Sequence, residues 1–312
     1  MKKVYLLLMS LFISMSVFGC SKNETIDESK DKITVYTTVF PIYDFTKNIG
    51  KDKIDLNYII PPGTEPHDYE ITPKGLKDIQ DANLLIKNGL GLDSFADKIE
   101  SESNLKVVVA TKGIEPLSYN DKETHNHSHE EDSDNHNHGE YDPHVWLDVD
   151  LVIKECENIK NALIEVDSKN KTYYENNYNE YVHNLEKIKD KYDSELSTIK
   201  NNKIIVSHDA YGYLCKKYNI EQISVTGITP NQEPSLSKVS EISNFAKTNK
   251  IGYILFDGLV NPKVAQTIAN EANIKTEILY SIDGVTKQDF DNDEDYISLM
   301  NKNLDTLKLI LK

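Results

Sequence analysis

The sequence predicts an α/β protein of two lobes, each a (β/α)4-type unit with a mainly parallel sheet, joined by a long rigid helix and separated by a cleft. Three observations support this prediction. Short apolar and β-branched runs alternate with helical segments in both halves of the chain, which is typical of parallel sheets. About 280 residues remain after the first 32, enough for two domains of ordinary size. A long amphipathic stretch separates the two sets of runs.

The N-terminus is typical of a signal peptide. Two lysines precede an apolar run, residues 4–18, which is shorter than the about 20 residues of a membrane-spanning helix. Residues 17–20 (VFGC) resemble a lipobox, and cleavage there would leave Cys20 as the lipid-bearing N-terminus. We expect a signal peptide at 1–19, a lipidated cysteine with a polar tether at 20–32, and anchoring on the outside of a Gram-positive type of cell membrane. An ordinary secreted protein is the alternative.

Residues 33–170 are expected to form the N-terminal lobe. A helix is predicted over Pro73–Asp81, because Thr72 is suited to cap it and proline to begin it. The predicted strands of this lobe are Ile33–Val39, Ile54–Ile60, Ala82–Asn88 and Lys106–Thr111.

A histidine-rich loop at 121–140 interrupts this lobe. Between residues 125 and 138 histidines alternate with carboxylates and no apolar side chain occurs, so the segment cannot bury enough surface to order itself. Such ligands suit Zn, Ni or Cu ions. We predict an accessory metal-collecting loop that binds through His125, His127, His129, His136 and His138. A hydrophilic insertion without a binding role is the alternative.

A linking helix is predicted over residues 171–200. Large apolar side chains recur there at steps of three and four, namely Tyr174, Tyr178, Tyr181, Leu185, Ile188, Tyr192, Leu196 and Ile199. A helix over Thr172–Ile199 would extend about 40 Å and could lie across both lobes. A coiled-coil dimer is the alternative, but this tyrosine-rich stripe lacks the regular aliphatic positions of one, so we expect a monomer. His183 lies off the stripe and is expected at the surface.

Residues 201–312 are expected to form the C-terminal lobe, with a helix over Pro262–Ala272 behind Asn261. Its predicted strands are Lys203–Ser207, Glu221–Thr226, Tyr253–Phe256 and Ile274–Tyr280. Cys156 and Cys215 fall in predicted helices far apart in sequence, so we interpret them as small buried hydrophobes without deducing a disulfide.

The charge balance excludes some classes of ligand. The formal net charge is −16, and loss of the two lysines in residues 1–19 would bring it to −18. Such an acidic chain is not expected to bind nucleic acid. Its basic residues are all lysine, so it also lacks the guanidinium groups favoured for phosphate and carboxylate recognition. An acidic surface attracts cations without selecting among them, so selectivity must come from a defined site.

Three histidines and one aspartate are candidates for such a site. His67, His208 and Asp283 each follow the C-terminal end of a predicted strand, and His144 precedes an amphipathic helix. Ligands of open α/β sheets bind beyond the carboxyl ends of strands, so we expect these side chains, two from each lobe, to meet in the cleft. Singly, each histidine could be a hydrogen-bonded structural residue. Together they form a tetrahedral set whose nitrogens favour Zn²⁺ over Mn²⁺.

Neighbouring carboxylates are candidates for auxiliary roles, because they could fix a ring tautomer. They are Glu65, Asp68, Asp142 and Asp209, and the sequence does not choose among them. No His-Glu-x-x-His motif or glycine-rich phosphate loop with Lys-Ser/Thr is present, so we expect binding without catalysis.

Four motifs together resemble the metal-binding solute-binding lipoproteins of zinc and manganese ABC importers. They are Pro66–Glu70 (PHDYE), Asp142–Leu147 (DPHVWL), Ser207–Gly212 (SHDAYG) and Pro230–Pro234 (PNQEP), and the resemblance spans residues 33–312. It implies two lobes joined by a rigid helix, with metal held between them and passed to a membrane permease.

The resemblance also implies ligands. His67, His144 and His208 match the three histidine positions of the family, and the manganese branch commonly has glutamate at the third. His208 and the histidine-rich insertion therefore resemble the zinc branch of high-affinity uptake and adhesin-like proteins. That branch often has glutamate or water at the fourth position, so Asp283 departs from it, and Glu65 or water is the alternative there.

We therefore expect an extracellular zinc-binding lipoprotein that delivers Zn²⁺ to a membrane permease, with the ATPase on another chain. The alternatives are a manganese-binding importer component, a secreted metallohydrolase and an adhesin.

Overall fold

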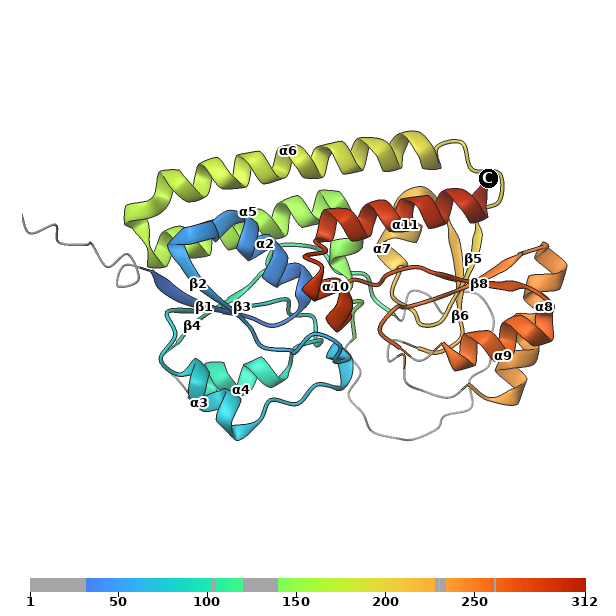
Figure 1. The fold of residues 1–312 in the computed structure, drawn as a ribbon, viewed down its shortest axis with the longest axis horizontal. Coiled ribbons are helices and arrows are strands. Elements are labelled where there is room, and N and C mark those ends of the chain that lie inside the picture. The colour runs from blue at the N-terminus through green and yellow to red at the C-terminus, as the bar shows by residue number, and fades with distance from the viewer. Residues whose placement is uncertain (1–31, 103–104, 120–139, 228–229, 231–233, 261) are drawn as a thin grey trace, which may run out of the picture. The chain divides into compact units, whose positions relative to one another are not determined.

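Two four-stranded parallel sheets form the centre of the fold (Figure 1). The structure, a computed structural model, describes residues 32–102, 105–119, 140–227, 230, 234–260 and 262–312. The predicted signal peptide, Cys20 and the histidine-rich tract from His125 to His138 lie outside the described residues.

The first sheet has the strand order β2-β1-β3-β4. Its strands are β1 (Ile33–Thr37), β2 (Ile54–Tyr58), β3 (Leu84–Lys87) and β4 (Lys106–Val109). The helices between them are α2 (Phe40–Gly50), α3 (Pro73–Ile79) and α4 (Phe95–Glu102), with short 3-10 turns at Lys51–Lys53 and Pro66–Asp68. As predicted, α3 begins with proline and the side chain of Thr72 accepts a hydrogen bond from Gly75 N, at 3.1 Å.

The second sheet repeats this arrangement in the order β6-β5-β7-β8. Its strands are β5 (Lys203–Val206), β6 (Glu221–Ser224), β7 (Tyr253–Phe256) and β8 (Lys275–Ile278). The helices between them are α7 (Gly212–Tyr218), α8 (Leu236–Asn249) and α9 (Lys263–Ala272). Every predicted strand is present, and the predicted fold class is confirmed.

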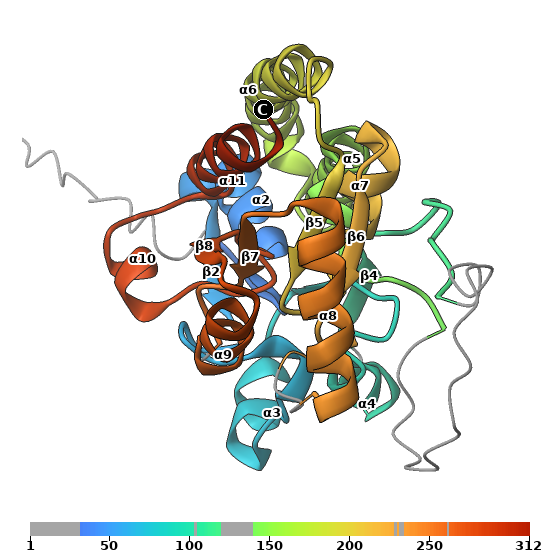
Figure 2. The same ribbon diagram turned by 90° about the vertical axis from the view of Figure 1, so that its right-hand side faces the viewer.

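A layer of helices extends along both sheets. It contains α5 (Val149–Val166), α6 (Lys171–Leu196) and α11 (Tyr296–Leu311). The remaining described elements are two 3-10 turns, at Val145–Leu147 and Ser168–Asn170, and the short helix α10 (Lys287–Asp291). Figure 1 shows α6 running across both sheets, and Figure 2 shows it stacked over α5 and α11. The 26 residues of α6 correspond to about 39 Å.

The apolar stripe of α6 is buried against this same chain. Tyr174, Tyr181, Leu185, Ile188, Tyr192 and Leu196 are at most 5% exposed, and α6 packs on α2, α5 and α11. Because these helices cover the stripe, it is not available as the seam of a coiled-coil dimer.

Other expectations concern single residues. Cys156 and Cys215 are buried free thiols, and the His183 side chain is 69% exposed. Among the described helices, none has the length and apolar character required to cross a membrane. The boundaries proposed for the signal peptide, tether, lobes and linking helix stay predictions.

Candidate metal centre

The three histidines and the aspartate predicted from the sequence lie together beyond the carboxyl ends of the strands. One nitrogen of each of His67, His144 and His208 and one oxygen of Asp283 all lie within 4.8 Å of one another. His144, His208 and Asp283 are fully buried, and the His67 side chain is 7% exposed. The structure thus brings together side chains from four distant segments, and their role as metal ligands stays a prediction.

The spacing of the donor atoms suits a small tetrahedral cation. The Nε2 atoms of His67 and His144 are 3.2 Å apart, and His67 Nε2 is 3.5 Å from Asp283 Oδ2. Tetrahedral zinc with Zn–N bonds of about 2.0–2.1 Å separates its donor atoms by about 3.4 Å. These two separations match that geometry. Two donor atoms that lie 4.8 Å apart, the upper limit of the separations in the group, would have to move about 1.4 Å closer together to bind one tetrahedral zinc ion.

His67 is held in the 3-10 turn that follows β2. The Glu65 side chain caps this turn by accepting a hydrogen bond from His67 N, at 3.2 Å. The loop that leads to the turn lies against the segment after Asp283, where a Cβ atom on Gly284 would be 2.8 Å from a methyl carbon of Leu259 and 3.3 Å from Cγ of Pro66. Glycine at 284 therefore lets the His67 loop approach the Asp283 loop.

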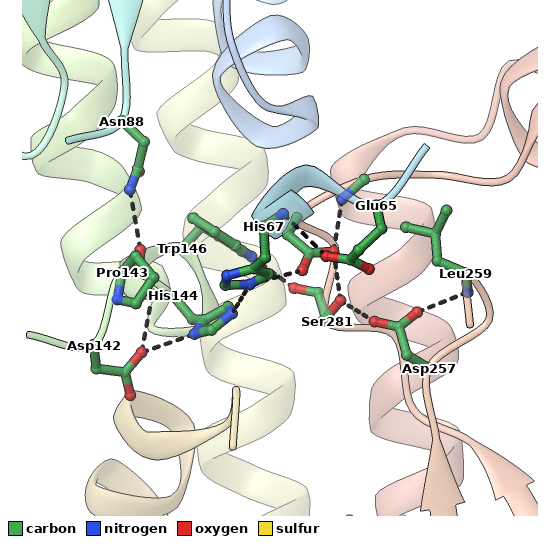
Figure 3. A network of polar contacts seen from close by, with 12 residues as sticks. Glu65, His67, Asn88, Asp142, Pro143, His144, Trp146, Asp257, Leu259 and Ser281 are labelled. Atoms are coloured by element: carbon green, nitrogen blue, oxygen red, sulfur yellow. Dashed lines mark hydrogen bonds and ion pairs between the residues drawn. The ribbon is translucent and has the colours of Figure 1, made fainter. Parts of the chain in front are cut away.

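His144 is fixed by its own neighbour in sequence (Figure 3). Asp142 Oδ1 accepts hydrogen bonds from His144 N, at 3.0 Å, and from His144 Nδ1, at 2.8 Å. Asn88, which follows β3, donates to Pro143 O at 3.1 Å and holds the same segment. Because Nδ1 carries the proton of this bond, the lone pair of Nε2 faces the other donor atoms, as in many metal-binding histidines. These contacts are those expected of an auxiliary residue, and the auxiliary role of Asp142 stays a prediction.

His208 follows β5 and is fully buried. Neither of its ring nitrogens has a hydrogen-bond partner among the described residues. Burial, together with the nearby histidines, lowers the pKa of His208 to about 3, and burial also lowers the pKa of His67. Both rings are therefore neutral at neutral pH, which is the form that binds metal ions.

Asp283 follows β8 on a backbone of unusual conformation. Ile282, a β-branched residue, has φ of 65°, which costs on the order of 1–3 kcal/mol and persists because its surroundings hold it. Phe40 N, at the start of α2, donates to Asp283 O at 3.0 Å. Burial alone would raise the pKa of Asp283, but His67 and the other two histidines hold it below its usual value. The side chain is therefore a carboxylate.

Two further carboxyl groups lie near Asp283. Burial, reinforced by the charge of Asp283, raises the pKa of Glu65 to about 10 and that of Asp257 to about 7. The negative charge of the centre is therefore concentrated on Asp283. The sequence alone does not single out Asp257, yet it follows β7 and so has the same strand-end position that predicts His67, His208 and Asp283.

The two remaining auxiliary candidates differ in their surroundings. Asp68 is exposed at the end of the 3-10 turn that holds His67. Asp209 accepts a hydrogen bond from the Gln222 side chain, and no hydrogen bond to the ring of His208 is present among the described residues.

Comparison with known proteins places the chain among metal-uptake proteins. Residues 35–309 match the family described as ZnuA, zinc-uptake complex component A, periplasmic. The chain belongs to this family. As a ZnuA-family protein it is a transport component and not an enzyme, as the sequence predicts.

Relatives within the ZnuA family align over nearly the whole chain. The high-affinity zinc uptake system protein ZnuA of Bacillus subtilis is 38% identical over 301 residues, which cover 95% of this chain and 93% of that protein. The zinc-binding lipoprotein AdcA of Streptococcus pneumoniae is 33% identical over 311 residues, which cover 99% of this chain and 61% of AdcA.

Solved structures agree with this relationship. The Zn(II)-bound ZnuA-like domain of S. pneumoniae AdcA has a TM-score of 0.77 at 30% identity, covering 90% of this chain and 99% of that domain. The metal-dependent lipoprotein YcdH of B. subtilis also has a TM-score of 0.77, at 35% identity, with 90% of this chain and 100% of YcdH covered. The ZnuA-family fold therefore frames the buried group of three histidines and one aspartate.

Proposed function

We propose that the chain is the zinc-capturing lipoprotein of an ABC importer. It binds Zn²⁺ between its lobes and delivers the ion, as cargo, to a membrane permease whose ATPase is a separate chain. Membership of the ZnuA family supports this role, as do the zinc uptake of the B. subtilis relative and the zinc binding of the S. pneumoniae relative.

The ligands of this proposal are His67, His144, His208 and Asp283. The observation that supports them best is the environment of His208, whose two ring nitrogens are buried without partners in the described structure. An unsatisfied buried polar group costs about 1–3 kcal/mol, and a metal ion at Nε2 or Nδ1 would remove part of that cost. The other donor atoms within 4.8 Å supply the remaining ligands.

The donor set favours zinc over manganese. Three neutral imidazoles and one carboxylate give a nitrogen-rich, four-donor site, whereas Mn²⁺ prefers more oxygen ligands and a higher coordination number. Protein donors at all four corners, three of them fully buried, also differ from a hydrolytic zinc site, which keeps one position open for water.

The proposal extends to the position of the protein in the cell. We assign residues 1–19 to a signal peptide and Cys20 to lipid attachment, with the following residues to 32 as a tether on the outer face of the membrane. The protein acts as a monomer, and the histidines of residues 125–138 collect metal ahead of the cleft.

A competition experiment tests the proposal. Purified, metal-depleted chain is titrated with Zn²⁺ in the presence of excess Mn²⁺, and X-ray absorption at the zinc edge reports the bound ligands. We expect one tight zinc ion with three nitrogen neighbours and one oxygen neighbour from the protein. Retention of manganese against one equivalent of zinc would contradict the assignment of the cargo.

A further inference from the structure

The two oxygens of the Asp283 carboxylate have different surroundings. Oδ1 accepts a hydrogen bond from the Ser281 hydroxyl, at 2.7 Å, and another from Gly284 N, also at 2.7 Å. Oδ2 has no hydrogen-bond partner among the described residues and lies 3.5 Å from His67 Nε2. The side chain is fully buried, so bulk water does not equalise the two oxygens.

These contacts decide how many oxygens Asp283 can offer to a cation. A carboxylate oxygen has two lone pairs. Those of Oδ1 are both engaged, one by a hydroxyl and one by a backbone N–H that no side-chain substitution removes. Only Oδ2 retains free lone pairs, and it is the oxygen that faces the histidines.

Ser281 is itself held in place from both lobes (Figure 3). Its hydroxyl also contacts Asp257 Oδ2, and the other oxygen of Asp257 is fixed by Leu259 N at 2.9 Å. Its carbonyl accepts a hydrogen bond from Trp146 Nε1, at 2.7 Å. The hydroxyl has a single proton, and burial raises the pKa of Asp257 to about 7, so protonated Asp257 donates to Ser281 Oγ while Ser281 donates to Asp283 Oδ1, at 2.7 Å.

We propose that Ser281 is a positioning residue that restricts Asp283 to a single coordinating oxygen and so makes the centre selective for a four-coordinate cation. This inference rests on the proposed zinc function. With one oxygen from Asp283, the centre offers four donors, the number that zinc prefers. A second oxygen would add a fifth donor and more oxygen character, which Mn²⁺ tolerates better.

Removing the hydroxyl frees one lone pair of Oδ1. In Ser281→Ala, Asp283 retains its bond from Gly284 N but gains a second oxygen able to reach the cation. Loss of an outer hydrogen bond to a metal ligand typically costs about 10–100-fold in affinity. We expect zinc affinity to fall by about that factor and manganese affinity to hold or rise, so that the ratio of the two falls at least about tenfold.

The test compares the purified parent chain with four variants. Ser281→Ala removes the hydroxyl, while Ser281→Thr and Ser281→Val add the same methyl group and differ from each other in the hydroxyl. Ser243→Ala is the control, because Ser243 is buried on α8 and its hydroxyl has no hydrogen-bond partner in the described structure. Zn²⁺ and Mn²⁺ affinities are measured by competition with chelators. The visible spectrum of the Co²⁺-loaded chain reports coordination number, because tetrahedral cobalt absorbs far more strongly than five- or six-coordinate cobalt.

We expect the parent, Ser281→Thr and Ser243→Ala to share a high zinc-to-manganese ratio and an intense cobalt spectrum. Ser281→Ala and Ser281→Val should show a lower ratio and a weaker spectrum. If Ser281→Ala does not fold, the threonine and valine pair decides alone. Parental ratios and spectra in the variants without the hydroxyl would overturn the inference and leave the zinc function intact. A parent chain that binds neither zinc nor cobalt would overturn both.

Discussion

Glu155 is a buried carboxyl group that has no hydrogen-bond partner in the described part of the chain, and its replacement by glutamine should stabilise the protein at alkaline pH. It lies on α5 beside the buried Val152, Cys156 and Ile159. Glu155 is fully buried, and neither of its side-chain oxygens has a hydrogen-bond partner among the described residues. Burial raises the pKa of Glu155 from 4.5 to about 8. The native protein therefore keeps a proton on Glu155 over a pH range in which the unfolded chain has lost it.

The sign and size of the effect follow from this difference in bound protons. Above the unfolded pKa of 4.5 the unfolded state binds fewer protons than the native state, so the free energy of unfolding falls as the pH rises towards about 8. The slope is about 1.4 kcal/mol per pH unit, which accumulates to about 4 kcal/mol at pH 8. Glu155→Gln has nearly the same shape as the protonated acid and does not titrate, so it should gain about this amount over the parent at pH 8 and nothing at pH 4.5.

Urea unfolding of the metal-free chains at several pH values measures this difference directly. Glu157→Gln is the matched control on the same helix, because Glu157 pairs with Lys154 at 2.7 Å on the surface and should change the free energy of unfolding by less than about 1 kcal/mol. The buried Asp44, whose pKa is raised to about 7 by burial, titrates in both the parent and the variant and cancels in the comparison. A gain for Glu155→Gln that is the same at acidic and alkaline pH would refute the reasoning.

Two further predictions concern metal binding. His208→Ala removes a donor atom from the candidate centre, so zinc affinity should fall by more than the about 10–100-fold that loss of an outer-shell partner costs. His183→Ala is the control, because His183 is exposed and this variant should bind zinc as the parent does. Equal losses of affinity for the two variants in calorimetric titrations would argue against the proposed centre. Deletion of residues 125–138 should lower the number of zinc ions bound per chain and leave the tight site unchanged, because the backbone hydrogen bond from Tyr119 N to Glu140 O joins the chain on either side. Loss of tight binding in equilibrium dialysis would contradict the assignment of the tight site to the cleft and of an accessory role to residues 125–138.

The strands and the clustering of the four candidate ligands could be predicted because both depend on local patterns. The apolar residues 84–86 of β3 are fully buried in the structure, as expected for an inner strand of a parallel sheet. Three of the candidate ligands, His67, His208 and Asp283, lie in segments that follow a strand, and the parallel arrangement of the strands brings these segments to the same edge of the sheets. The fourth, His144, lies directly before a 3-10 turn and α5. A periodic stripe likewise predicts α6. The helix expected from it, Thr172–Ile199, starts one residue later and ends three residues later than the observed helix.

The hydrogen-bond partners of the candidate ligands could not be predicted in the same way. Ser281 and Gly284 contact Asp283 through a backbone turn in which Ile282 adopts a left-handed conformation, and no residue type in the segment signals that conformation. Asn88 reaches the His144 segment across 55 positions of sequence. Such contacts depend on how the two sheets and the helical layer pack, which a pattern along the chain does not contain.

Trp146 gives the protein an internal optical probe. It is the single tryptophan of the sequence, is fully buried, and has its ring centroid 5.4 Å from that of His144. Its indole N–H donates to Ser281 O, and its own carbonyl accepts from Tyr296 Oη at 2.7 Å, so one residue touches the histidine segment, the aspartate loop and the start of α11. Fluorescence excited at the red edge of the absorption band, where tyrosine does not absorb, therefore reports from a single point beside the candidate metal centre. A paramagnetic ion such as Co²⁺ in the centre would quench that emission, so occupancy can be followed in solution without a label.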